Sequence, residues 1–222
     1  MRKIGLVYTS TTPELIALVE KEVYKQVGED ARLMSYTDPT ILEETREHGY
    51  VTCNGACRLI TMFLKAAQDG ADAILNICSS VGEAADSAQD VARYIGVPIV
   101  RIDEEMCRDA VRKGSRIGVL ATLPTTLNPT KNTLYRVARE MRRSVTLVDG
   151  LVDAFGMDQD QFTRLLIGKA MELKSQADVI LLCQGSMAFC EDAIHKATGL
   201  PVFSSPRYGA VALKAALEAK GV

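Results

Sequence analysis

The sequence has few of the residues and motifs on which most metal and nucleotide sites depend. Its only two histidines, His48 and His195, lie far apart among 222 residues. It contains no G-x-G-x-x-G, no G-x-x-x-x-G-K-[ST] and no G-x-S-x-G. The first two patterns cradle nucleotide phosphates, and the third presents a catalytic serine. We therefore expect no dinucleotide or NTP site, no histidine-based metal site and no serine triad.

Charge of one sign is nowhere concentrated. Lys and Arg number 26 against 28 Asp and Glu, which gives a net charge of −2, and no block of like charges occurs. Nucleic acid and anionic membrane are therefore not expected as partners. Arg136, Arg139, Arg142 and Arg143 recur at helical spacing with Glu140 among them, and we interpret them as a solvated helix face.

Long apolar runs are absent as well. The N-terminal M-R-K-I-G-L-V-Y-T-S has two basic residues and an apolar run too short for a signal peptide or a membrane span. No other segment reaches the roughly eighteen apolar residues that a span needs. A cytoplasmic protein is expected, and its six cysteines are then expected mostly as reduced thiols.

The chain does contain a regular alternation of short apolar runs with longer segments of helical period. This pattern predicts an α/β fold with mainly parallel sheets and helices on both faces. Helices are expected to open at Thr12-Pro13-Glu14 and at Asn128-Pro129, with proline in the first helical position. The apolar runs are 4–8, 31–36, 73–78, 98–102, 116–122, 144–148, 179–183 and 200–204.

Three segments of the first half recur in the same order in the second half. The offsets are 113, 106 and 103 residues, and they predict two similar α/β lobes related by a pseudo-twofold axis, with a cleft between them. The alternative is that the apolar strands of all α/β proteins resemble one another. The matched pairs are KIGLVYTSTTP with RIGVLATLPTT, ADAILNIC with ADVILLC, and IGVPIV with TGLPVF.

Small and hydroxyl-bearing residues follow the matched strands. Ligands of open parallel sheets bind beyond the carboxyl ends of strands, so these residues are candidates for a binding site. Hydroxyls and the N–H groups of helix N-termini bind anions, which predicts a small anionic substrate such as a carboxylate. The residues are Thr9 and Ser10, then Ser79 and Ser80, then Thr122 and Thr125, and finally Gln184, Gly185 and Ser186.

A cysteine ends the central strand of each half. Cys78 and Cys183 fall at equivalent places of the repeat, within one residue. A single cysteine at a strand end is more often a packing residue, but the matched pair favours chemistry. One thiolate could remove a proton from a carbon beside a carboxylate while the other thiol returns one from the opposite face. By contrast, Cys107 and Cys190 lie within helical pattern and are interpreted as core residues.

The two remaining cysteines form a C-x-x-x-C at a predicted helix start. Cys53 and Cys57 do not have the C-x-x-C spacing of redox sites, and no second pair completes a zinc site. Their role is left unassigned.

The segments IGLVYTSTTP, NICSSVG, RIGVLATLPTT and LLCQGSM resemble the aspartate/glutamate/hydantoin racemase superfamily, and the resemblance covers essentially the whole chain. It implies a first lobe of residues 1–102 plus 204–222 and a second of 103–203, with the helix at about 206–219 returning to the first. It implies Cys78 and Cys183 as an acid/base pair, with no cofactor and no metal. It also implies substrate contacts at Thr9, Ser10, Ser79, Ser80, Thr122 and Thr125. A homodimer is expected on general grounds.

The residues after the cysteines differ from one branch of that family. Glutamate racemases usually have Cys-Asn-Thr and Cys-Thr-His, whereas this chain has Cys-Ser-Ser and Cys-Gln-Gly-Ser, closer to hydantoin racemases at the second place. Two cysteines favour racemisation or epimerisation. A decarboxylase or cis–trans isomerase of a small diacid, and a small-acid-binding protein without turnover, remain alternative hypotheses. The candidates for substrate specificity are Tyr50, Asn54, Arg58, Arg101 and Arg207.

Overall fold

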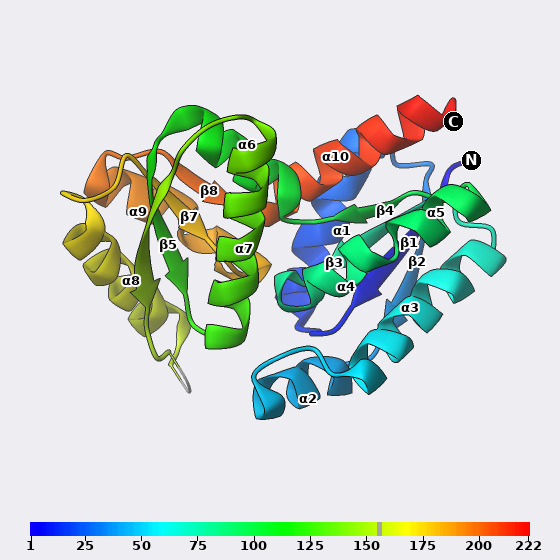
Figure 1. The fold of residues 1–222 in the computed structure, drawn as a ribbon, viewed down its shortest axis with the longest axis horizontal. Helices are drawn as coiled ribbons and strands as arrows, with labels where there is room; N and C mark the ends of the chain where they lie inside the picture. The colour runs from blue at the N-terminus through cyan, green and yellow to red at the C-terminus, as the bar shows by residue number, and fades with distance from the viewer. Residues whose placement is uncertain (155–156) are drawn as a thin grey trace. The chain divides into compact units, whose positions relative to one another are not determined.

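The computed structural model describes residues 1–154 and 157–222, which form two compact units (Figure 1). The first unit comprises Met1–Ile102 and Pro206–Val222, and the second Asp103–Ser205. The sequence-based division returns to the first lobe at residue 204, two residues earlier. Each unit is built on its own four-stranded parallel sheet, as the α/β prediction requires.

The sheet of the first unit has the strand order β2-β1-β3-β4. Its central strands β1 and β3 are almost entirely buried, which explains why both are continuous apolar runs rather than alternating ones. Neighbouring strands are parallel throughout. The strands are β1 (Lys3–Tyr8), β2 (Arg32–Thr37), β3 (Ala73–Ile77) and β4 (Ile99–Arg101).

Helices cover both faces of this sheet. On one face Leu15 and Val19 of α1 and Leu213 of α10 share a core with β1 and β3, and on the other Leu59 and Phe63 of α3 share a second core. The first predicted helix start is confirmed, because the Thr12 hydroxyl caps α1. The helices are α1 (Pro13–Val27), α2 (Thr40–His48), α3 (Cys53–Gln68), η1 (Ser79–Val81), α4 (Gly82–Ser87), α5 (Gln89–Ile95) and α10 (Ser205–Lys220).

The second unit repeats this plan with the strand order β6-β5-β7-β8. Leu166 and Leu173 of α8 and Ile194 of α9 pack on one face of its sheet, while α6 and α7 pack together and contact the strands. Its strands are β5 (Arg116–Ala121), β6 (Thr146–Leu151), β7 (Val179–Leu182) and β8 (Val202–Ser204). Its helices are α6 (Glu104–Lys113), α7 (Pro124–Glu140), α8 (Gln159–Leu173), η2 (Gly185–Cys190) and α9 (Glu191–Thr198).

The internal repeat is visible in the packing of two matched glycines. Gly5 of β1 pairs in register with Ile74 of β3, and Gly118 of β5 pairs with Ile180 of β7. Neither site has room for a side chain, since an added Cβ would lie 2.9 Å from the Ala66 Cβ at Gly5 and 2.8 Å from the Ile180 Cδ1 at Gly118. The two halves therefore share both strand order and close packing at the same place.

Two aspartates at equivalent places of the repeat, Asp72 and Asp178, directly precede the central strands β3 and β7. The Asp72 carboxylate accepts a hydrogen bond from the Lys3 amide at 2.8 Å, and the Asp178 carboxylate accepts one from the Arg116 amide at 2.9 Å. Hydrogen bonds from the Arg116 side chain and amide lower the pKa of Asp178 to about 2. These contacts anchor the first strand of each sheet to the loop that leads into its central neighbour.

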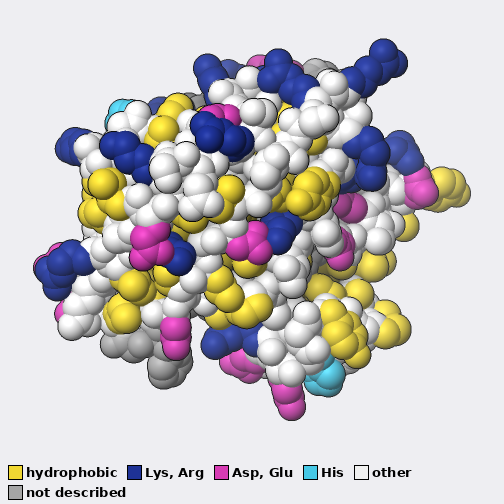
Figure 2. Space-filling model, turned by 60° about the vertical axis from the view of Figure 1, so that its left-hand side comes forward, with side chains coloured by type: hydrophobic (Ala, Val, Ile, Leu, Met, Phe, Trp, Pro, Cys, Tyr) yellow, Lys and Arg dark blue, Asp and Glu magenta, His cyan; other side chains and the backbone are white. Residues whose placement is uncertain are grey.

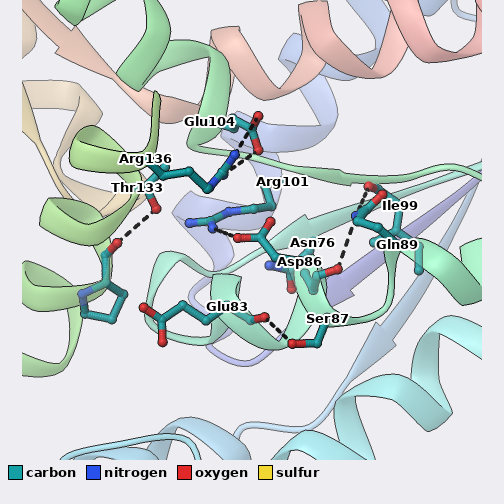
Figure 3. Close-up of polar contacts among 12 residues, drawn as sticks. Asn76, Glu83, Asp86, Ser87, Gln89, Ile99, Arg101, Glu104, Thr133 and Arg136 are labelled. Carbon is teal, nitrogen blue, oxygen red and sulfur yellow. Dashed lines mark hydrogen bonds and ion pairs between the residues drawn. The ribbon is translucent and has the colours of Figure 1, made fainter. Parts of the chain in front are cut away.

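The predicted helix start at Asn128-Pro129 is wrong. Helix α7 begins at Pro124, and Pro129 lies inside it. Pro124 already takes the first helical position, which suits proline because its missing N–H has no partner there. The Pro129 carbonyl accepts a hydrogen bond from the Thr133 hydroxyl at 2.9 Å (Figure 3). The run at 144–148 is likewise displaced, since strand β6 spans Thr146–Leu151.

The predicted arginine face on α7 is only partly correct. Helix α7 ends at Glu140, so Arg142 and Arg143 lie beyond it. Arg136 does not simply face solvent, because its guanidinium contacts Glu104 of α6 at 2.9 Å (Figure 3). Figure 2 shows Lys and Arg interspersed with Asp and Glu over the face drawn. Across residues 1–154 and 157–222, no helix combines the length and apolar character needed to cross a bilayer.

Candidate active site

In the first unit, the parallel pairing of β1 and β3 brings two predicted site segments to one sheet edge. Tyr8 pairs with Ile77 at the ends of these strands, so Thr9 and Cys78 follow neighbouring strands. Thr9 is fully buried, and its hydroxyl has no hydrogen-bond partner among the residues described. A buried hydroxyl without a partner is costly, so Thr9 is well suited to receive a polar group of a ligand.

Cys78 is half-buried in a short extended connection between β3 and η1. The Asn76 side-chain amide donates to the Cys78 carbonyl at 3.2 Å and so holds this connection to the end of β3. Ser79 and Ser80, both buried, form the first turn after the cysteine. Ser10, on the neighbouring β1 connection, is half-buried. All the predicted site residues of the first unit thus follow β1 or β3 at the same edge.

A buried arginine lies beneath the segment that follows Cys78. Arg101 of β4 is only 4% exposed, and its guanidinium contacts the Asp86 carboxylate of α4 at 2.6 Å (Figure 3). It also occupies the space beside Gly82, the first residue of α4. Since this guanidinium is already paired with Asp86, Arg101 supports α4 and is not a free cation for a substrate.

In the second unit, an amide side chain links the ends of β5 and β7. The Gln184 side-chain N–H donates to the Thr122 hydroxyl at 2.7 Å, and its carbonyl oxygen accepts from the Thr122 amide at 3.3 Å. The Cys183 amide donates to the Leu120 carbonyl at 2.9 Å, which continues the pairing of the two strands up to the cysteine. Thr122 and Gln184 therefore bond to each other, which orients the connection that carries Cys183.

The Cys183 thiol has no exposed surface, and burial raises its pKa to about 12. The nearby Thr130 hydroxyl lowers this pKa, although it makes no regular hydrogen bond among the described residues, and the carboxylates of Asp103 and Asp149 raise it further. The protonated thiol is thus strongly favoured at neutral pH in this state of the protein. Thr130 was missed by the sequence reasoning. Its available signal was the four-residue spacing from Thr126, which places both on one face of α7.

The other predicted residues of the second unit differ in accessibility. Thr125 is buried in the first turn of α7, and its hydroxyl has no hydrogen-bond partner within the described part of the chain. Gly185 is half-buried and Ser186 is exposed, both in η2 directly after Gln184. Thr125 therefore resembles Thr9 of the first unit in having a buried hydroxyl without a partner in the described residues, although the two do not occupy the same place in the repeat.

A carboxylate from the helix after each cysteine bonds to the last strand of the same unit. Asp86 of α4 contacts Arg101 at the end of β4, and Glu191 of α9 accepts a hydrogen bond from the Ser204 hydroxyl at the end of β8. The positions are equivalent in the repeat, although the donors differ. Each contact ties the segment after a cysteine to the adjacent strand end.

The remaining specificity candidates lie in other settings. Arg58 is paired with Asp38 at 2.8 Å and with Glu44, and the Asn54 amide donates to the same Glu44 at 3.2 Å. Tyr50 is exposed. Arg207 packs over the Tyr208 ring, 4.9 Å from its centre. In the described residues, no group of three or more His, Cys, Asp or Glu side chains could hold a metal ion.

The fold and the two strand-end segments define a class of α/β protein with repeated parallel sheets and a cysteine after each central strand. The sequence matches the family described as Asp/Glu/Hydantoin racemase over residues 4–213, and the chain belongs to this family. Among curated proteins, none matches the sequence significantly.

Solved structures share the fold. Allantoin racemase from Klebsiella pneumoniae is 16% identical with a TM-score of 0.72, over 100% of this chain and 89% of that one. Glutamate racemase from Bacillus anthracis is 17% identical with a TM-score of 0.71, over 99% and 83%. Aspartate racemase from Picrophilus torridus is 14% identical with a TM-score of 0.61, over 100% and 95%. At these identities the likeness establishes the fold.

Proposed function

We propose that the protein is a cofactor-independent racemase or epimerase in which Cys78 and Cys183 act as an acid/base pair. The reacting centre is a carbon next to the carboxylate or carbonyl of a small acid, amino acid or hydantoin. The observation that carries the proposal is the matched placement of the two cysteines, each directly after the central strand of a sheet with the same strand order. Membership of the racemase family supports the same reaction class.

The two thiols would have different roles at the start of a turnover. The raised pKa of Cys183 favours its protonated form, so Cys183 is assigned as the proton donor. The role of base then falls to Cys78, which would act as a thiolate. Cys78 takes the proton from the substrate carbon, and Cys183 gives its proton to the opposite face of that carbon. The substrate leaves with inverted configuration, Cys78 is then protonated and Cys183 is a thiolate, so the next turnover runs in the reverse sense.

The substrate's anionic or carbonyl end would be bound by the hydroxyls near each cysteine. Thr9 and Thr125 have buried hydroxyls without partners, and Ser79 and Ser80 lie in the turn after Cys78. The structural relatives are named as allantoin, glutamate and aspartate racemases. The compounds to test are therefore dicarboxylic amino acids, and ureides or hydantoins.

The experiment is to follow the exchange of the substrate's α-hydrogen in deuterated water by NMR. Aspartate, glutamate, allantoin and 5-substituted hydantoins are offered as single enantiomers. A substrate should lose its α-proton signal while optical rotation decays. Cys78→Ser and Cys183→Ser should each lower the inversion rate by at least about a thousandfold, since each removes one half of the acid/base pair. Cys53→Ser, at an exposed cysteine of α3, is the matched control and should behave as wild type.

A one-thiol reaction is the second candidate, and the unlike settings of the cysteines favour it. Cys183 is fully buried, whereas Cys78 is half-buried. A decarboxylase or cis–trans isomerase of a small diacid needs only one reactive thiol. Activity that survives Cys183→Ser but not Cys78→Ser would establish this reading. Binding of a small acid with no exchange and no product in any assay would instead identify a binding protein.

We also propose a cytoplasmic location and a homodimeric state. The six cysteines are all free thiols, as expected of a protein in a reducing compartment. Sedimentation velocity would measure the oligomeric state, and a monomer at micromolar concentration would contradict the second part.

A further inference from the structure

Cys53 and Cys57 are exposed thiols one helical turn apart at the start of α3. Residues four apart lie on the same face of a helix, with Cβ atoms about 5–6 Å from each other. The proximity of Cys53 also raises the pKa of Cys57, which agrees with this helical spacing. The two exposed thiols therefore lie on one face of α3 in the first unit, on a different element from Cys78.

The start of α3 is held in place by a polar network. The Thr52 hydroxyl accepts from the Gly55 amide at 3.0 Å and donates to Glu44 of α2. Arg58 joins α3 to Glu44 from the next turn. Helices α2 and α3 pack together (Figure 1). Because this first turn is capped and cross-linked, the two cysteines are presented at a fixed spacing.

That spacing is poorly suited to a disulfide. A disulfide needs Cβ atoms about 3.5–4.5 Å apart, closer than two residues of one regular helix turn. A metal ion bound by both sulfurs allows a larger separation between them than a disulfide does. Two metal–sulfur bonds of about 2.3 Å each place the sulfurs up to roughly 4.6 Å apart. Histidines at the same i, i+4 spacing on a helix hold one metal ion between them.

The number of ligands selects the kind of metal. Structural zinc sites take four ligands, and no three-membered group of His, Cys, Asp and Glu is found among residues 1–154 and 157–222. Thiolates select soft ions, and Cu(I) is the soft ion that two sulfurs alone can satisfy. The positive end of the α3 dipole also favours a site with net negative charge.

We propose that Cys53 and Cys57 form a two-thiolate site for a soft monovalent cation, Cu(I). Binding forms two Cu–S bonds and releases both thiol protons to solvent, leaving a bis-thiolate complex with a net charge of −1. No electron is transferred, because copper enters as Cu(I). Affinity should rise with pH, since protons compete with the metal for both sulfurs.

The test is an anaerobic titration of the folded protein with Cu(I) against a chromophoric Cu(I) chelator. It is done in a Cys78→Ser background, so that Cys53 and Cys57 are the exposed cysteines and no half-buried one remains. One equivalent of Cu(I) should bind at least about tenfold more tightly than to either Cys53→Ser or Cys57→Ser. The two single variants should lose affinity alike. Circular dichroism verifies that each variant is folded.

A relocated thiol provides the matched control. Cys57→Ser combined with Leu64→Cys keeps two exposed positions on α3 but places them eleven residues, about 16 Å, apart along the helix. This variant should bind as weakly as Cys57→Ser alone. Equal affinity of the wild-type pair and the relocated pair, or retention of tight Cu(I) by the Cys53→Ser, Cys57→Ser double variant, would overturn the proposal. The titration does not depend on any racemase activity.

Discussion

The Arg101 guanidinium fills the space in which a side chain at Gly82 would lie. A Cβ built at Gly82 would be 2.5 Å from the Arg101 Cζ, and Arg101 cannot easily move because Asp86 holds it at 2.6 Å and it is buried. The first residue of α4 is therefore a glycine, because the Arg101 guanidinium leaves no room for a Cβ atom there. This contact packs the first residue of α4, four residues after Cys78, against the Arg101 side chain of β4.

Gly82→Ala should destabilise the protein by about 1–3 kcal/mol, as overpacking of a filled interior does. Urea unfolding followed by circular dichroism measures the change. The matched control is Gly168→Ala in α8, where nothing lies within 4 Å of the added Cβ. Alanine there should stabilise by about 0.5–1 kcal/mol through helix propensity. If both variants shift stability equally, the Arg101 contact is not what excludes a side chain at Gly82.

The unfolding free energies of Thr125→Val and Thr122→Val should show which of the two hydroxyls stabilises the fold. The hydroxyl that does not is the candidate for binding a ligand. The Thr125 hydroxyl has no partner in the described residues, so its replacement by a methyl should leave the free energy of unfolding unchanged or slightly higher. Thr122→Val removes the hydrogen bond that the Thr122 hydroxyl accepts from Gln184, while the bond from the Thr122 amide remains, and should cost about 1 kcal/mol. With a racemisation substrate in hand, Thr125→Val should raise KM. A loss of stability in Thr125→Val as large as in Thr122→Val would contradict this division.

The ion pairs between α6 and α7 should make stability depend on acid pH. Burial opposes ionisation of Glu104, but hydrogen bonds from Arg136 and Arg108 outweigh it and lower the pKa of Glu104. A carboxyl whose pKa is lowered on folding stabilises above its unfolded pKa, and that stabilisation is lost as pH falls. Glu104→Gln should therefore cost about 2 kcal/mol at pH 7, and this cost should shrink progressively as pH falls below the unfolded pKa of about 4.3. Glu105→Gln, at a more exposed position of α6, is the control and should change stability little at either pH.

Sequence pattern predicted the strands well because burial on both faces of a parallel sheet demands uninterrupted apolar runs. Such runs mark β1, β3, β5 and β7 within a residue or two. The sequence pattern predicted the wrong start for α7. Pro124 and Pro129 both suit the first position of a helix, and only packing in the folded protein determines which one begins it. Fold class and family were accessible in the same way, from the repeat and the strand-end motifs.

The polar contacts around the candidate site were less predictable. Arg101 was a specificity candidate by sequence, but its burial against Asp86 depends on two side chains fifteen residues apart. Gln184 likewise bonds to Thr122 across 62 residues. Such pairs depend on three-dimensional register, which a single sequence does not encode as a local pattern. The roles of Cys78 and Cys183 stay a prediction that the exchange experiment tests.

The protonation of Cys183 gives the last prediction, an alkaline dependence of stability. A thiol whose pKa is raised on folding contributes stability below its unfolded pKa of about 8.5, and this contribution is lost as pH rises toward its folded pKa. For Cys183 the window extends from about pH 8.5 to about 12. The difference in unfolding free energy between wild type and Cys183→Ser should thus fall by up to about 1.4 kcal/mol per pH unit between pH 9 and 11.

Alkylation provides an independent measure of the same thiol. In a Cys53→Ser, Cys57→Ser background, iodoacetamide at pH 8 should modify half-buried Cys78 well before fully buried Cys183. With a pKa of about 12, only about one Cys183 in ten thousand is a thiolate at that pH. Peptide mass spectrometry assigns the modified residue, and modification of both after unfolding in urea shows that each is chemically competent. Equal rates in the folded protein, together with a pH-independent stability difference between wild type and Cys183→Ser, would mean that Cys183 is not held as a buried neutral thiol.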